Sequence, residues 1–115
     1  MSDNCLFCKI AKGEIPSQKV YEDEKVFAFR DISPQAPLHV IIIPKKHISA
    51  LSVVSASDDN ILGHVQSAAA EIAKQFQETK NGFRVVNNCG ADAGQTVFHI
   101  HYHLLAGRTF GWPPG

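Results

Sequence analysis

The feature that most constrains this chain is a run in which histidines alternate with large apolar residues, His99-Ile100-His101-Tyr102-His103-Leu104-Leu105. Strict alternation predicts a β-strand over residues 99–105, because successive side chains of a strand point to opposite faces. The imidazoles then share one face at steps of roughly 6.6 Å. A neutral imidazole is a nucleophile, and its ordinary pKa of about 6.5 allows a small shift to make it an acid. This strand is therefore the first place to look for catalytic chemistry.

The start of the chain predicts a short helix followed by a hairpin. Residues 5–12 can form a helix that Asn4 caps and Gly13 ends, with Leu6, Phe7 and Ile10 on its buried side. The β-rich segments 20–22 and 26–30 flank a short polar run, which is the pattern of an antiparallel hairpin.

The next segment predicts a loop and then a buried strand. Residues 31–37 contain two prolines, which exclude both a helix and a central strand, so they must form an ordered loop. Residues 38–43 are a continuous apolar run that only His39 interrupts and Pro44 ends. Such a run predicts a strand buried on both faces, in which His39 requires an explanation.

The longest predicted helix covers residues 58–79, with Ser57 as its N-cap. Apolar residues recur there at helical spacing from Ile61 to Phe76, and His64 on the same helix has no partner that the sequence reveals. A strand over 83–88 and a glycine-rich loop over 88–96 lead into the histidine strand. The order of elements, with one long helix interrupting an antiparallel sheet, predicts the α+β class.

Size and charge exclude several classes of protein. The 115 residues suit one domain spanning 1–115, and the 11 basic side chains balance the 11 acidic ones, so no nucleic-acid partner is expected. No apolar run approaches the roughly 20 residues needed to cross a bilayer, and the start is not a secretion signal. We therefore expect a cytoplasmic protein with no membrane partner.

The three cysteines are more consistent with free thiols or a metal than with a disulfide framework. Their number is odd, and Cys5 and Cys8 have the spacing of one half of a structural zinc site, whereas Cys89 lies alone. A buried pair of free thiols is the simpler alternative for Cys5 and Cys8.

Taken together, several segments resemble the histidine triad (HIT) family, and in particular its nucleotide-binding branch. The histidine run fits the motif His-φ-His-φ-His-φ-φ, where φ is hydrophobic. The other matching segments are Asp31-Ile32-Ser33-Pro34-Gln35-Ala36-Pro37, Ile43-Pro44-Lys45-Lys46-His47-Ile48, Gly94-Gln95 and Gly111-Trp112-Pro113-Pro114-Gly115. The resemblance implies a HIT-like fold, a five-stranded antiparallel sheet with one short and one long helix, that pairs into a continuous sheet across a homodimer.

The resemblance also implies an activity, the cleavage of P–N bonds in adenosine 5′-phosphoramidates, and of acyl adenylates, to release AMP. His101 would be the nucleophile that forms a nucleotidyl-histidine, with its Nδ1–H donated to a nearby backbone carbonyl. His103 would bond a phosphate oxygen and help to protonate the leaving amine, and His39 and His99 would complete the catalytic histidines. No cofactor would be needed for this chemistry.

The resemblance further implies a binding site for a purine nucleotide. Asp31 would accept from the ribose hydroxyls, although aspartate before a proline loop is commonly a turn residue. Phosphate would be held by Asn88, Gly94, Gln95 and Thr96, where relatives often carry serine at the last position. The base would lie in an apolar slot, and Trp112 would reach the active site of the partner subunit. The residues of that slot would be Leu6, Phe7, Ile10, Phe29, Ile32 and Ile41.

In relatives that carry the cysteine pair, structural zinc is held by four ligands whose positions here are Cys5, Cys8, His47 and His99. Such a site would leave His101 free. Two rival functions remain at this stage: a metal-dependent hydrolase, because His-x-His on a strand also builds catalytic zinc sites, and a nucleotide-binding dimer without turnover.

Overall fold

The central strand β3 (Leu38–Pro44) is buried along its whole length in the computed structural model, which describes residues 4–115. The opening residues 1–3, used above to argue against a secretion signal, lie outside the described part. The buried strand predicted for residues 38–43 is therefore confirmed, and it extends by one residue to Pro44.

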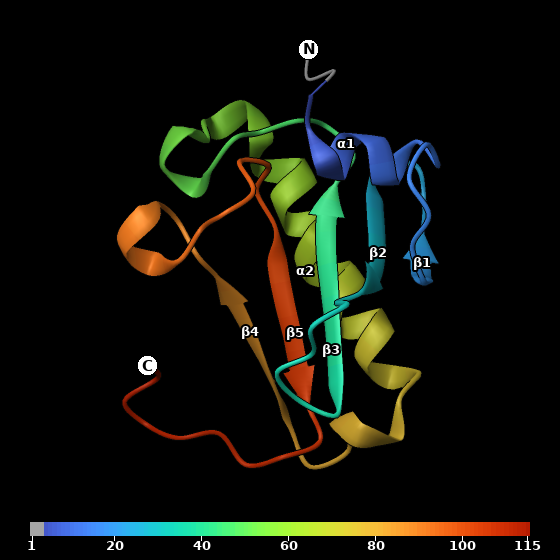
Figure 1. Cartoon of the computed structure of the whole chain (residues 1–115), viewed down its shortest axis with the longest axis vertical. Helices are drawn as coiled ribbons and strands as arrows, with labels where there is room; N and C mark the ends of the chain where they lie inside the picture. Colours follow the sequence, from blue (N-terminus) through green and yellow to red (C-terminus); the bar gives the residue numbers. More distant parts are fainter. Residues whose placement is uncertain (1–3) are drawn as a thin grey trace.

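Five strands form one antiparallel sheet in the order β1-β2-β3-β5-β4 (Figure 1). The other strands are β1 (Lys19–Glu22), β2 (Val26–Arg30), β4 (Phe83–Asn87) and β5 (Tyr102–Ala106). The predicted hairpin is confirmed as β1–β2, and the predicted strand at 83–88 ends one residue early. The α+β class and the antiparallel sheet are as expected.

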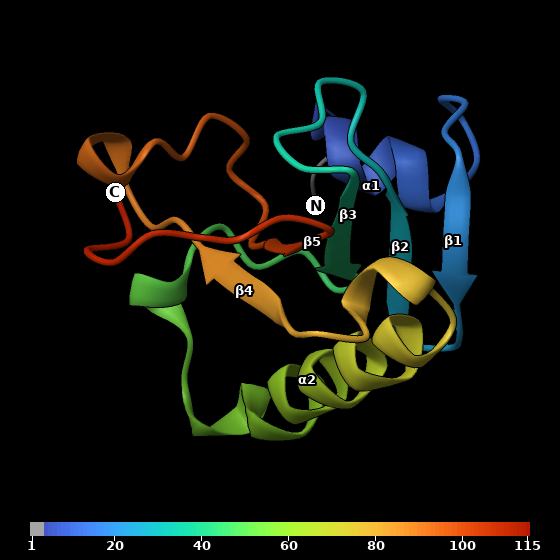
Figure 2. The same cartoon turned by 90° about the horizontal axis from the view of Figure 1, so that it is seen from below.

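The two helices cover opposite faces of the sheet (Figure 2). On one face α2 (Asp59–Lys74) packs through Val65 and Ile72 against Val40, Ile42 and Leu104. On the other face α1 (Leu6–Ala11) packs through Phe7 and Ile10 over Phe27, Phe29, Ile41 and Ile43. The second, smaller core is the one that the histidines border.

Both helices are shorter than predicted, and side chains explain the differences. Cys5 rather than Asn4 caps α1, because its Sγ accepts a hydrogen bond from the Cys8 N–H at 3.3 Å. Ser57 is not the N-cap of α2: a 3-10 turn at Ala56–Asp58 precedes the helix, and the Asp58 carboxylate accepts from the Ser55 N–H at 3.1 Å.

The far end of α2 stops at Lys74, five residues before the predicted end at Thr79. The Thr79 hydroxyl donates to the backbone carbonyls of Ala73 and Phe76, and the chain continues as a 3-10 turn over Gln77–Thr79. A side chain that bonds the backbone in this way competes with the continuing helix.

The histidine strand is also shorter than predicted, since β5 begins at Tyr102. Before that point the ladder is replaced by other bonds: the Ile100 N–H donates to Ile48 O at 2.6 Å, and the Asn87 side chain donates to His101 O at 2.9 Å. The alternation still holds, because Ile100, Tyr102 and Leu104 all lie in the core under α2.

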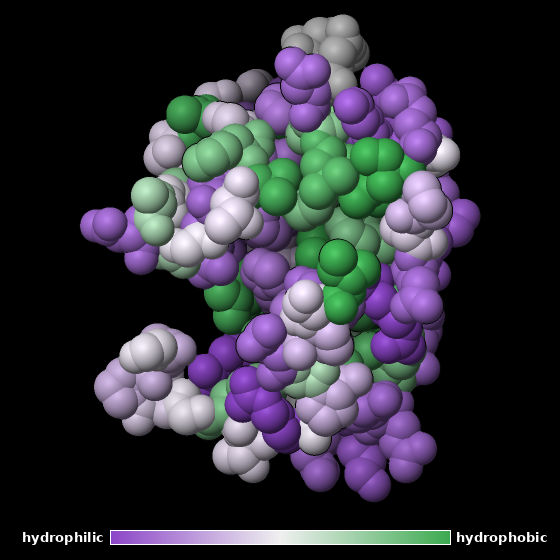
Figure 3. All heavy atoms as spheres, viewed as in Figure 1, coloured by the Kyte–Doolittle hydropathy of each residue, from purple (hydrophilic) through white to green (hydrophobic). Residues whose placement is uncertain are grey.

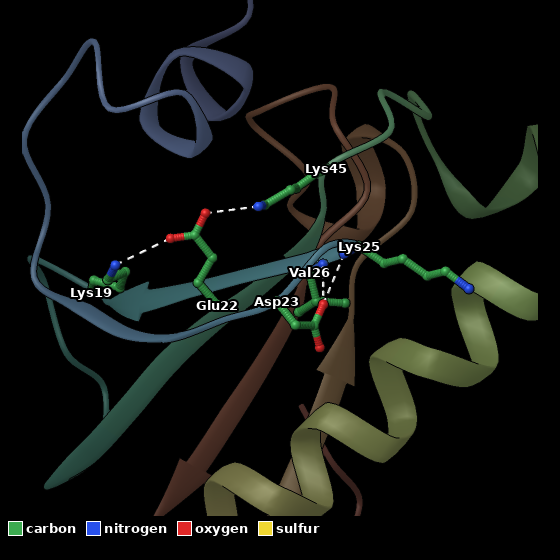
Figure 4. A network of polar contacts seen from close by, with 6 residues as sticks. All are labelled: Lys19, Glu22, Asp23, Lys25, Val26 and Lys45. Carbon is green, nitrogen blue, oxygen red and sulfur yellow. Dashed lines mark hydrogen bonds and ion pairs between the residues drawn. The ribbon is translucent and has the colours of Figure 1, made fainter.

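The β1–β2 turn is held by acidic side chains (Figure 4). Asp23 Oδ1 accepts from the backbone N–H groups of Lys25 at 2.8 Å and Val26 at 2.9 Å. The Glu22 carboxylate contacts Lys19 at 3.1 Å and Lys45 at 2.7 Å, and so ties β1 to the segment after β3. Asp23 Oδ2 also lies 2.6 Å from Nε2 of His64, which supplies the partner that the sequence did not reveal.

None of the helices within residues 4–115 is long and apolar enough to span a membrane.

Candidate active site

His101 is held by the backbone of the histidine run itself. Its Nδ1 lies 2.8 Å from the carbonyl oxygen of His99, so the Nδ1–H donates to that oxygen. The expected carbonyl partner is thereby confirmed. With the proton on Nδ1, the lone pair of a neutral ring is on Nε2, and this atom makes no hydrogen bond to any of residues 4–115. The edge of the Phe7 ring packs against the imidazole, with ring centroids 5.0 Å apart.

His39 and His103 come from neighbouring strands and meet through their rings. His39 lies on β3 and His103 on β5, and Nε2 of His39 is 2.8 Å from Nδ1 of His103. The rings of His101 and His103 are adjacent, with centroids 5.1 Å apart. The sequence therefore placed His39, His101 and His103 in one cluster correctly.

One backbone group decides where the protons of this pair sit. The Gln35 N–H donates to Nδ1 of His39 at 3.0 Å, and a backbone N–H can only donate. His39 Nδ1 must therefore be unprotonated, so that a neutral His39 carries its proton on Nε2 and donates it to Nδ1 of His103. A neutral His103 then carries its own proton on Nε2.

Burial favours the neutral form of both rings. It lowers the pKa of His103 to about 4, and the neighbouring rings of His101 and His39 act in the same direction. It also lowers the pKa of His39, although the nearby Asp31 carboxylate, 3.4 Å from His39 Nε2, opposes the shift.

A second cluster joins Cys5, Cys8, His47 and His99, whose ligand atoms all lie within 4.8 Å of one another. Nδ1 of His99 is 3.4 Å from Cys5 Sγ, 3.5 Å from Cys8 Sγ and 3.2 Å from Nδ1 of His47. A tetrahedral zinc ion would separate its nitrogen ligands by about 3.3 Å and its sulfur and nitrogen ligands by about 3.6 Å. The four residues therefore fit a closed metal site in donor type and spacing.

The ring of His99 faces this cluster and not the rings of His39 and His103. Its Nε2–H donates to the carbonyl of Pro44 at 2.7 Å, and its Nδ1 points to the cysteines and His47. Such a bond leaves Nδ1 unprotonated, as a metal ligand must be. Both ring nitrogens of His99 are thus engaged away from His101, which the residue contacts through its carbonyl, and a catalytic role of the His99 ring stays a prediction that this geometry does not favour.

The predicted base slot divides into a buried part and an exposed part. Phe7, Ile10, Phe29 and Ile41 are buried together beneath α1. Leu6 is 43% exposed and Ile32 is 98% exposed. The first four residues are thus core residues of the smaller cluster, and only the exposed pair presents a free apolar surface to a ligand.

Asp31 follows β2 and begins the loop as a turn residue. Its Oδ1 accepts from the Ser33 N–H at 2.7 Å, which is the contact expected of a turn residue. Its Oδ2 faces His39. The carboxylate therefore lies beside the histidine cluster while it also shapes the loop.

The side-chain amide of Gln95 is hydrogen-bonded within the protein. Its amide nitrogen donates to Ser49 O at 2.9 Å and Val97 O at 3.1 Å, and its oxygen accepts from the Gly90 N–H at 2.9 Å. A primary amide has two N–H donors, and both are used. In this structure the side chain closes the glycine-rich loop, and a contact from Gln95 to a phosphate stays a prediction.

The remaining predicted residues lie at the surface. Thr96 and Gly94 are exposed, and Asn88 is partly exposed directly after β4. Trp112 is 83% exposed on the C-terminal tail, which Arg84 holds by donating to Gly111 O at 2.9 Å.

Two residues of the site were not predicted. Gln35 acts through its backbone N–H and Asn87 through a bond to the His101 carbonyl, and no pattern in the sequence marks either role. Gln35 lies between the two loop prolines and Asn87 ends β4, and these positions are the only sequence signal that either residue gives.

Comparison with known proteins gives the family directly. The model of the HIT domain matches residues 12–110. The purine nucleoside phosphoramidase of Escherichia coli is 47% identical over 111 residues, covering 96% of this chain and 93% of that protein. The 14 kDa zinc-binding protein of Zea mays is 51% identical over 112 residues, covering 96% of this chain and 87% of that protein.

A solved structure agrees with the fold. The crystal structure of a HIT family hydrolase from Legionella pneumophila superimposes with a TM-score of 0.94 at 50% identity, covering 97% of this chain and 100% of that one. The resemblance carried by the histidine run is therefore confirmed, and the chain belongs to the HIT domain family, among relatives that are hydrolases.

Proposed function

We propose that this protein hydrolyses purine nucleoside 5′-phosphoramidates, and the related acyl adenylates, to the nucleoside monophosphate through a nucleotidyl-histidine on His101. The observation that carries the proposal is the bond from His101 Nδ1–H to His99 O, which leaves Nε2 unprotonated and without a partner among residues 4–115. The relative from Escherichia coli named purine nucleoside phosphoramidase supports the choice of substrate.

In this proposal, Nε2 of His101 attacks the α-phosphorus as the bond from phosphorus to the amine breaks. Water then attacks the nucleotidyl-histidine, which releases the monophosphate and restores the ring. His103 presents its Nε2–H beside His101, where it can bond a phosphate oxygen and supply the nearest proton to the departing amine. Phosphoryl transfer depends mainly on such positioning and on charge stabilisation.

We assign the nucleoside to the surface between Asp31, Leu6 and Ile32, and the phosphate to the neighbourhood of Asn88, Gly94 and Thr96. The Asp31 carboxylate beside His39 supports a contact to the ribose hydroxyls, because each of its oxygens can accept more than one hydrogen bond. The backbone and hydroxyl donors of the exposed loop support a contact to the phosphate.

The decisive experiment traps the intermediate. Protein mixed with an adenosine 5′-phosphoramidate is quenched, digested and analysed by mass spectrometry for an adenylyl group on His101. We expect the adduct in the wild type and in His64→Ala, and we expect no adduct and at least about a 10³-fold loss of kcat in His101→Ala. AMP binding with neither adduct nor turnover in the wild type would contradict the proposal and favour a binding protein.

A metal-dependent hydrolase is the less supported alternative. Nε2 of His39 and Nδ1 of His103 lie only 2.8 Å apart, which is a hydrogen-bond distance and shorter than the separation of about 3.3 Å expected for two nitrogen ligands of one zinc ion. Activity that chelation removes at once and added metal restores would favour this alternative.

We also propose that the cluster of Cys5, Cys8, His47 and His99 binds structural zinc. Thiolates and imidazoles are the ligands that zinc prefers, the spacing fits, and a relative is named for zinc binding. A bound zinc ion would tie α1 to the segment that carries His101. It would supply no catalytic group.

We further propose that the protein is a homodimer whose sheet continues across β4. This strand is an edge strand with a free side, and it exposes the apolar residues Phe83 and Val85. Figure 3 shows the molecule hollowed beside β4, between the C-terminal tail and the loop that follows this strand. Sedimentation equilibrium should give a dimer for the wild type and a monomer for Val85→Glu. A monomeric wild type would contradict this arrangement.

A further inference from the structure

The loop at residues 31–37 contacts both His39 and the start of the C-terminal tail. Gln35 is the residue that makes both contacts. Its N–H donates to Nδ1 of His39, and its carbonyl oxygen accepts from Nε of Arg108 at 3.1 Å. A continuous path of hydrogen bonds thus runs from Arg108 through Gln35 and His39 to His103.

The loop is internally braced between these contacts. The Ser33 N–H donates to Asp31 at 2.7 Å, and the Gln35 side chain donates back to Ser33 O at 3.0 Å. These bonds fix the shape of the loop. The Asp31 N–H donates to His39 O at 3.0 Å and ties the base of the loop to β3, so contacts from outside act on the tip of the loop around Gln35.

Gly107 supplies the second outside contact. A Cβ added at Gly107 would lie 2.7 Å from Cβ of Pro37, and the residue has a φ of +97°, where side chains are disfavoured. Glycine at this position therefore lets the end of β5 approach the loop closely enough for Arg108 to reach Gln35. The two contacts are adjacent in the chain and act on the same loop.

We propose that Gly107 and Arg108 are positioning residues that hold the Gln35 N–H on His39 Nδ1, and so fix the ring proton of both His39 and His103 on Nε2. Without this donor, only the Asp31 carboxylate, 3.4 Å from His39 Nε2, still favours the Nε2–H form, and a form with the proton on Nδ1 becomes accessible. Its Nε2 would then be a hydrogen-bond acceptor. A neutral His103 would have to carry its single proton on Nδ1 in order to donate to it. His103 would then have no proton on Nε2 to offer a phosphate.

The side chain of Arg108 is itself held in place. Its guanidinium lies 4.3 Å from the centre of the Phe110 ring and donates to Thr109 O at 3.1 Å. Arg84 contacts the same ring at 5.2 Å and bonds Gly111 O, but it has no contact to the loop. The chain therefore contains a matched control, since Arg84 orders the same tail without touching Gln35.

The test reads the tautomers directly, in the full-length protein without substrate. Long-range ¹H–¹⁵N NMR distinguishes the protonated from the unprotonated nitrogen of each imidazole. We expect Nε2–H forms of His39 and His103 in the wild type, in Arg84→Ala and in Arg108→Lys, which keeps a donor. In Arg108→Ala we expect a second set of signals with His39 protonated on Nδ1.

A glycine pair separates the contact with Pro37 from backbone strain. Gly107→Ala should shift the tautomers as Arg108→Ala does. Gly13→Ala, at a φ of +79° with open space around it, should not. If Gly107→Ala does not fold, the comparison of Arg108→Ala with Arg84→Ala decides the question alone.

The kinetic consequence rests on the proposed phosphoramidase activity. In an assay of phosphoramidate hydrolysis, Arg108→Ala should lower kcat about 10-fold and change KM by less than about twofold, whereas Arg84→Ala should leave kcat unchanged. Unchanged tautomers in Arg108→Ala, equal effects of Arg84→Ala, or a tautomer shift that leaves kcat intact would each overturn the inference. Because the NMR readout needs no substrate, its result is separate from any failure of the proposed activity.

Discussion

The carbonyl oxygen of His99 lies 2.8 Å from Nδ1 of His101, while the ring of the same His99 faces Cys5, Cys8 and His47. One residue thus orients the proposed nucleophile with its backbone and completes the candidate metal site with its side chain. If zinc binds as proposed, it would hold α1 and the residue whose carbonyl orients His101.

Removal of zinc should therefore lower stability before it lowers activity. With free zinc at a hundred times Kd, the bound ion would contribute about 2.7 kcal/mol to the free energy of unfolding. We expect chelation, or Cys5→Ala, to remove the metal and lower the Tm, while phosphoramidate hydrolysis persists at short times. Metal analysis of protein purified without an affinity tag checks the zinc content.

The third cysteine provides the control for this experiment. Cys89→Ala lies outside the cluster and should retain stoichiometric zinc. Well-folded wild-type protein with little zinc would contradict the assignment.

Stability should fall as the pH is lowered from about 6.5 to about 4, because His103 is held neutral in the folded protein. Its pKa is lowered from 6.5 to about 4 on folding, mainly by burial, so the unfolded chain binds more protons across this window. Stability is then complete above the unfolded pKa and is lost on acidification. Urea denaturation midpoints at pH 7, 5.5 and 4.5 measure the effect.

His103→Asn isolates the contribution of this ring. Asparagine cannot titrate, so the decrease in the midpoint between pH 7 and 4.5 should be smaller in the variant than in the wild type. An equal decrease in both proteins would assign the whole effect to other groups.

The sequence predicted those parts of the site that depend on local pattern. Alternation placed the histidines on one side of the sheet and Ile100, Tyr102 and Leu104 on the other, and the apolar run at 38–43 gave the central strand. The place of His39 beside His103 came from the family resemblance and not from a local pattern. The spacing of Cys5 and Cys8 gave half of the metal cluster. Periodicity suffices for such features because it acts within a few residues of the chain.

The contacts that the sequence did not foresee join distant segments of the chain. Gln95 looked like a phosphate donor, but its amide is used up by Ser49 and Val97. The ring of His99 was expected among the catalytic histidines, but its Nε2–H donates to Pro44 O and its Nδ1 faces the cysteines. The choice between two partners for one polar group is made by tertiary packing, which no short motif encodes.

The core beneath α2 should be sensitive to lost volume at Ile72. This side chain is fully buried between the helix and the sheet. Ile72→Ala removes buried methyl groups and leaves a cavity, which costs about 2 to 5 kcal/mol. Val53→Ala, at a residue that is 60% exposed, should change the free energy of unfolding by less than about 0.5 kcal/mol. Urea denaturation of both variants makes the comparison, and a small cost at Ile72 would show that this part of the core repacks.

The Asp23 carboxylate should stabilise the fold by joining the β1–β2 turn to α2. Burial alone would raise its pKa, but the hydrogen bonds from His64, the Lys25 N–H and Tyr21 prevail and lower it to about 2. Its contribution is therefore complete above the unfolded pKa of 3.8 and is lost as the pH falls towards about 2. Asp23→Asn should lower the free energy of unfolding at pH 7 by up to about 1 kcal/mol, since the pair with His64 is partly exposed. Glu24→Gln, one residue further on at an exposed position, is the matched control and should have no such effect. Equal denaturation midpoints for the two variants at pH 7 would show that the turn and α2 are held together without this carboxylate.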